Sequence, residues 1–61
     1  MLNTRFKKLT GMHKGHVYKV VAPANEFESP LRWSLQCEGE ADDKITVPEN
    51  QLEDRQLWQP M

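Results

Sequence analysis

Cysteine is nearly absent from this sequence: among its 61 residues there is only Cys37. An intramolecular disulfide is therefore excluded. One thiol and two histidines also fall short of the four closely spaced Cys or His ligands of a structural zinc site, so we expect no metal and no cofactor. A single unpaired thiol favours a reducing compartment, and the expected location is the cytoplasm.

Long apolar runs are missing as well. The longest is Val20-Val21-Ala22, which ends at Pro23. This is too short for a membrane span or for the apolar part of a signal peptide, so we expect no membrane partner. The length fits one domain, residues 1–61, which buries only about 60% of its unfolded surface. A well-filled core or self-association must stabilise it, and a homo-oligomer is an open alternative.

Acidic residues are missing from the first 22 positions, which carry five basic side chains. The other 39 positions carry nine acids and three bases, and the net charge of the whole chain is only −1. A patch of one sign attracts partners of the opposite sign, which makes the basic end a candidate nucleic-acid surface. Alternatively, its lysines face acids on adjoining strands. The basic residues are Arg5, Lys7, Lys8, Lys14 and Lys19.

The patterns that this sequence does contain are mostly those typical of β-strands. The segment from Leu31 to Glu38 alternates apolar and polar residues, which predicts a half-buried strand. The β-branched and aromatic segment from Val17 to Ala22 predicts a second strand. Two shorter strands are expected at 4–9 and 44–47, with turns at 10–14, 23–30 and 38–43.

The tail from Pro48 to Trp58 fits two structures. We expect a 3₁₀ turn from Pro48 to Gln51 and then a brief closing strand from Leu52, because the apolar residues of the tail form no continuous helical stripe. The alternative is one C-terminal helix with Pro48 at its first position.

Three segments carry a resemblance to a known family. Lys14-Gly15-His16-Val17-Tyr18-Lys19-Val20-Val21 looks like the lysine–glycine step into the second strand of Src-homology-three domains. Arg32-Trp33-Ser34-Leu35 resembles their tryptophan-bearing third strand, and Val47-Pro48-Glu49-Asn50-Gln51-Leu52 resembles their proline-x-asparagine turn. The resemblance implies an all-β fold, a small five-stranded Src-homology-three-like barrel of the kind found in small bacterial and phage proteins. Their opening-strand motif is absent, and Gln51 replaces the tyrosine after the asparagine, so recognition of proline motifs is not implied.

Few groups suit metal binding or catalysis. His13 and His16 are three residues apart and, with Cys37, would seed a zinc or copper site that lacks a fourth ligand. We expect them instead to be exposed loop residues. Cys37 lies in phase with the apolar positions of its strand, which favours burial over a nucleophilic role. The cluster of Glu38, Glu40, Asp42 and Asp43 matches no calcium loop and predicts a solvated hairpin tip.

These observations predict a non-enzymatic binding module that acts through protein–protein interaction, as an accessory or inhibitory factor. Trp33 is expected to lie largely in the core, whereas Trp58 either closes the bottom of the barrel or anchors a partner. The alternative function is a nucleic-acid-binding barrel that uses the basic strands. The expected partner-binding residues are Tyr18, Trp33, Pro48, Asn50 and Trp58.

Overall fold

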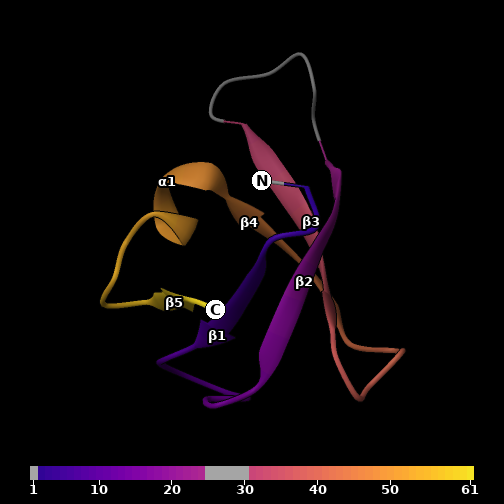
Figure 1. Cartoon of the computed structure of the whole chain (residues 1–61), viewed down its shortest axis with the longest axis horizontal. Coiled ribbons are helices and arrows are strands. Elements are labelled where there is room, and N and C mark those ends of the chain that lie inside the picture. Colours follow the sequence, from indigo (N-terminus) through magenta and orange to yellow (C-terminus); the bar gives the residue numbers. More distant parts are fainter. Residues whose placement is uncertain (1, 25–30) are drawn as a thin grey trace.

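The computed structural model describes residues 2–24 and 31–61. Within them the chain forms five antiparallel strands and one short helix (Figure 1). The prediction of a small, mostly-β chain with five strands is confirmed at this level. The predicted loop at 23–30 falls largely outside the described residues. In chain order the elements are β1 (Arg5–Lys8), β2 (Val17–Pro23), β3 (Arg32–Cys37), β4 (Lys44–Pro48), α1 (Glu49–Leu52) and β5 (Trp58–Pro60).

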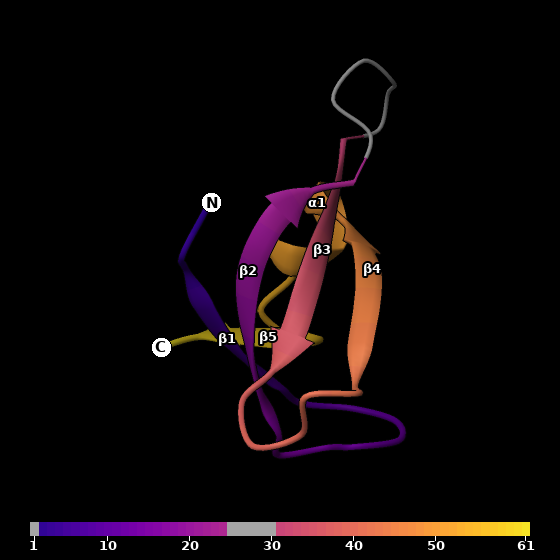
Figure 2. The ribbon, with the colours of Figure 1, turned by 90° about the vertical axis from the view of Figure 1, so that its right-hand side faces the viewer.

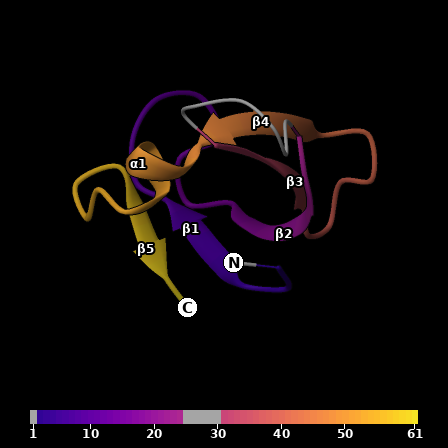
Figure 3. The same ribbon diagram turned by 90° about the horizontal axis from the view of Figure 1, so that it is seen from above.

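The strands form one sheet in the order β4-β3-β2-β1-β5. Seen from above, this sheet curls strongly from β4 round to β5, and α1 lies beside the ends of the curl (Figure 3). The register between β2 and β3 shifts between Val20 and Ala22, where β2 carries a bulge. A bulge bends its strand and increases the local twist, which helps the sheet to curl.

The concave face of the sheet holds the core. In β2, Tyr18 and Val20 are fully buried while Lys19 and Val21 between and beyond them are exposed. The rings of Tyr18 and Trp58 meet edge to face, with centroids 5.6 Å apart, so β5 is attached to the middle of the sheet. The buried hydrophobic set is Phe6, Tyr18, Val20, Leu35, Cys37, Val47, Leu52 and Trp58.

Strand β3 follows the predicted alternation. Leu35 and Cys37 are buried, and Arg32 on the other face is exposed. Cys37 is thus a core residue, as expected. Trp33 is partly buried and packs against the core without being enclosed by it, so the expectation that it lies largely inside is met only in part.

The tail departs from its prediction in two ways. Residues 49–52 form one turn of α-helix rather than 3₁₀, because Glu53 donates its N–H to the carbonyl of Glu49, four residues back. The closing strand begins at Trp58 rather than Leu52. A turn intervenes because the Asp54 carboxylate accepts the N–H of Gln56 (2.9 Å) and the Asp54 carbonyl accepts the N–H groups of Leu57 and Trp58.

The helix of the described residues, α1, is short. In the described residues no helix is long and apolar enough to cross a membrane.

Candidate functional site

The two ends of β3 carry different side chains, and each end is a candidate site. Five residues at the end where β3 finishes define the histidine end: His13, His16, Tyr18, Cys37 and Asp43. Five at the end where β3 begins define the tryptophan end: Leu31, Trp33, Pro48, Glu49 and Asn50. In Figure 2, α1 marks the upper, tryptophan end, and the turns that close β1–β2 and β3–β4 lie at the lower, histidine end.

The turn between β1 and β2 presents the two histidines. Its backbone is fixed at both ends, because Gly15 N–H donates to the Lys8 carbonyl (2.8 Å) and Lys8 N–H donates to the His16 carbonyl (2.9 Å). His13 has a φ of 65°, in the left-handed region that only glycine enters freely. The His16 N–H donates to the His13 carbonyl at 3.0 Å, which keeps the two rings on one side of the turn.

The turn between β3 and β4 presents the carboxylate. The Gln36 side-chain amide donates to the carbonyls of Glu40 (3.0 Å) and Ala41 (2.7 Å), which braces this turn from within. The Cys37 N–H donates to the Asp43 carbonyl at 2.9 Å. Asp43 is thereby aimed inward, and its Oδ2 accepts a 2.8 Å hydrogen bond from the buried Tyr18 hydroxyl.

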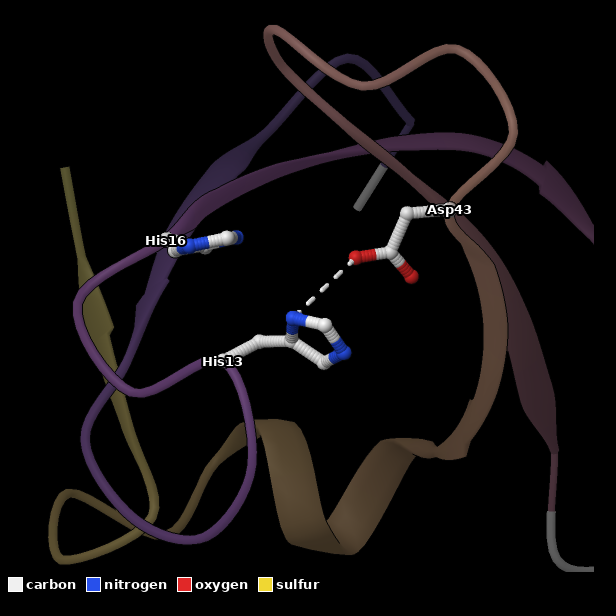
Figure 4. A group of neighbouring side chains, drawn as sticks. All are labelled: His13, His16 and Asp43. Carbon is white, nitrogen blue, oxygen red and sulfur yellow. Dashed lines mark ion pairs between the residues drawn. The ribbon is translucent and has the colours of Figure 1, made fainter.

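These two turns bring three potential metal-ligating groups together (Figure 4). The ligand atoms of His13, His16 and Asp43 all lie within 4.8 Å of one another, and His13 Nδ1 is 4.0 Å from Asp43 Oδ2. The histidine rings have centroids 5.2 Å apart. On the inner side, Cys37 Sγ is 3.7 Å from His16 Nδ1.

Burial keeps the inner groups of this cluster protonated. Desolvation raises the pKa of the Tyr18 hydroxyl, and the hydrogen bond to Asp43 raises it further. Desolvation, followed by the charges of Asp43 and Glu40, likewise raises the pKa of the Cys37 thiol. A reactive cysteine has the opposite shift, toward the thiolate. Tyr18 therefore acts as a hydrogen-bond donor and Cys37 as a neutral thiol.

The tryptophan end is apolar with one carboxylate. The Trp33 indole N–H donates to Glu49 Oε1 at 3.3 Å, and the Glu49 N–H donates to the Leu31 carbonyl at 2.8 Å. Leu31, Trp33 and Pro48 are each half-buried, and Asn50 is exposed. A broad indole face thus lies at the rim of the sheet with a carboxylate beside it.

The five predicted partner-binding residues are divided between these regions. Trp33, Pro48 and Asn50 lie at the tryptophan end. Tyr18 and Trp58 lie in the core, 0% and 4% exposed, so their rings are covered. Of the two alternatives for Trp58, the structure has the one in which it closes the core.

The five basic residues do not all share one face: Arg5, Lys7 and Lys19 lie on the outer face of the sheet, and Lys8 and Lys14 lie elsewhere. Arg5 binds Glu38 through two nitrogens, with distances of 2.8 to 3.1 Å, across the outer face of β2. Lys19 contributes to lowering the pKa of the same carboxyl group. Lys7 and Lys8 alternate along β1 and point to opposite faces, while Lys14 lies in the turn that presents the histidines.

Asp43 is the site residue that sequence reasoning missed. It was assigned to a solvated hairpin tip, and three of that cluster's acids are indeed exposed. Its position next to β4 would have distinguished Asp43 from the three exposed acids. Asp43 lies directly before β4 and opposite Cys37, and Cys37 pairs with Tyr18.

Comparisons with protein-family models, with curated proteins and with solved structures find no match.

Proposed function

We propose that this chain is a non-enzymatic binding module that contacts an extended segment of a protein partner through the tryptophan end. The observation that carries the proposal is the position of Trp33, whose indole N–H donates to Glu49 while part of the ring stays exposed. Tryptophan is enriched among the residues that dominate interface energies. A ring already oriented by a hydrogen bond loses little freedom on binding, which favours affinity.

The proposal includes the finer fold, a Src-homology-three-like small barrel. The strand order β4-β3-β2-β1-β5, the strong curl and the single helical turn between β4 and β5 support it. In such a barrel the start of the third strand and the turn before the last strand form one rim. Trp33 and Pro48 occupy those two positions.

The chemistry of this rim selects the partner. The indole face attracts a cation through its quadrupole, and the neighbouring Glu49 carboxylate adds a full negative charge. Pro48 and Leu31 supply half-buried apolar surface at the same end. We therefore expect an extended peptide in which an arginine is flanked by apolar residues such as proline.

The nucleic-acid alternative has less support. Two of its five basic residues, Arg5 and Lys19, interact with Glu38 on the outer face. Binding through phosphates requires several free cations on one surface.

A titration followed by ¹⁵N NMR tests the proposal, because each indole N–H gives its own signal. The probes are a peptide of arginines spaced by prolines, and matched peptides with lysine, glutamine or glutamate in place of arginine. We expect a saturable shift of the Trp33 indole signal with the arginine peptide, weaker with lysine and absent with glutamate.

Glu49→Gln keeps an oxygen acceptor for the indole and removes the charge, so it should weaken binding about fivefold or more. Glu53→Gln, an exposed acid one turn later, is the matched control and should bind as wild type. If none of the peptides moves the Trp33 signal, the proposal fails. If an oligonucleotide binds instead, with an affinity that falls log-linearly with salt, the nucleic-acid alternative replaces it.

A further inference from the structure

We propose that His13, His16 and Asp43 form a binding site for Zn²⁺ at the histidine end. The proposal does not rest on the peptide surface. Trp33 and Cys37, which mark the two ends, are four residues apart along β3, or about 13 Å. Zinc binding and peptide binding can therefore succeed or fail separately.

The donor set fits zinc. Two imidazoles and one carboxylate are the protein ligands of many three-residue zinc sites, in which a fourth position stays open to water. Imidazole nitrogen selects first-row transition metals over calcium and magnesium, which require oxygen ligands. With both histidines neutral, the carboxylate offsets half of the charge of the ion.

The spacing is close to what the ion needs. Bonds of about 2.0–2.2 Å to nitrogen and oxygen place two tetrahedral ligands roughly 3.3 Å apart. The ligand atoms here lie within 4.8 Å of one another, and the His13–Asp43 pair is 4.0 Å apart. The His13 side chain is 42% exposed at the tip of its turn. Because it is exposed, this side chain is free to rotate toward the other two ligands.

Neighbouring groups already orient two of the three ligands. The Tyr18 hydroxyl donates to Asp43 Oδ2 and fixes the carboxylate. When zinc occupies His16 Nε2, the Nδ1–H of His16 is directed at Cys37 Sγ, 3.7 Å away, and the thiol proton at the Glu38 carbonyl, 3.6 Å away. Partners of this kind fix the tautomer and ring orientation of a metal-bound histidine. Tyr18 and Cys37 are positioning residues in this arrangement, not ligands.

A zinc ion bound at this site would connect the β1–β2 turn with the β3–β4 turn. His13 and His16 come from the β1–β2 turn and Asp43 from the β3–β4 turn. Each turn is fixed by its own backbone hydrogen bonds, and the pairing of β2 with β3 places the two turns side by side, so the ligands are held near each other before the ion arrives. Zinc binding should therefore stabilise the native state rather than induce a new fold.

Isothermal titration of the untagged chain with zinc chloride tests the site. We expect one ion per chain. His13→Asn removes a ligand and keeps a residue that tolerates the left-handed backbone, so the variant should fold and bind at least about tenfold more weakly. Asp42→Asn, an exposed acid next to Asp43, is the matched control and should bind as wild type. Equal affinities for the two variants, or no saturable binding by wild type, would overturn the proposal.

Cobalt substitution tests the assigned ligands. Co²⁺ bound by nitrogen and oxygen alone gives weak visible bands, whereas a thiolate ligand adds an intense near-ultraviolet charge-transfer band. We expect no such band, and retention of zinc binding in Cys37→Ser. A charge-transfer band that disappears in Cys37→Ser would contradict the three-ligand assignment. Saturation by calcium or magnesium at the same concentration would contradict the donor chemistry.

Discussion

The tryptophan end and the histidine end are built on the same strand yet have opposite chemistry. At the beginning of β3, Trp33 and its apolar neighbours surround one carboxylate. At its end, Cys37 lies among two imidazoles, a phenol and a second carboxylate. The fully buried Leu35 lies between them. A 61-residue domain can thus hold two unlike surfaces when its core fills the middle of a curled sheet and leaves both rims to the turns.

The largest expected effect comes from a change in the core that both ends share. Leu35→Ala deletes a fully buried side chain and should lower the free energy of unfolding by about 2–5 kcal/mol, a large fraction of the total for so short a chain. Urea denaturation followed by the NMR signals of Trp33 and His16 should show both ends lost in one transition. Thr46→Ala, exposed on β4, should stay within about 0.5 kcal/mol of wild type. Separate transitions for the two ends would show that they do not depend on one core.

A smaller loss of stability is expected from a change that affects the histidine end alone. Tyr18→Phe removes the hydroxyl that donates to Asp43 and should cost about 1.5 kcal/mol, because the acceptor is charged and mostly buried. The Trp33 indole signal should not move.

A double-mutant cycle with Asp43→Ala, which removes the acceptor, isolates this interaction. Strictly additive losses in the two single variants would mean that the hydrogen bond contributes nothing to stability.

The matching change at the tryptophan end should cost less. Glu49→Ala removes the acceptor of the Trp33 indole, but the bond is long at 3.3 Å and Glu49 is partly solvated. We expect a loss of about 0.5 kcal/mol and faster hydrogen exchange of that indole N–H. Glu53→Ala serves as the control and should leave the exchange rate unchanged. Unchanged exchange in Glu49→Ala would mean that the ring is held by its contacts with the core.

The smallest effect concerns the outer face, which belongs to neither end. The hydrogen bond from Arg5, the largest cause, lowers the pKa of Glu38 in the folded state. A lowered folded-state pKa stabilises the protein above the unfolded-state pKa, and this stabilisation is lost as the pH falls through the folded-state value. The difference in Tm between wild type and Glu38→Gln should therefore shrink below pH 4 and at high salt. A difference that does not change with pH would contradict the role of the ion pair.

Structural features that have a local cause could be predicted from the sequence, and features that depend on specific side-chain contacts or on distant residues could not. The alternation in β3 predicted its buried positions because a half-buried strand has a fixed period. The start of β5 was missed because the Asp54 side chain, rather than a periodic pattern, sets the turn before it. The two histidines were recognised as potential ligands, but Asp43 was missed because it comes from a second turn about 30 residues away, which the pairing of β2 with β3 brings alongside the first.

The pairing of β1 with β5, called the seam below, has a consequence for the order in which the strands assemble. It joins segments about 50 residues apart through three residue pairs, from Phe6 with Pro60 to Lys8 with Trp58. Closing so long a loop costs more entropy than forming the neighbouring hairpins, so we expect this seam to close late in folding and to open early in native fluctuations. Trp58 leaves with it and uncovers the ring of Tyr18 beneath Asp43. The closed seam thus keeps the ring of Tyr18 covered beside the histidine end.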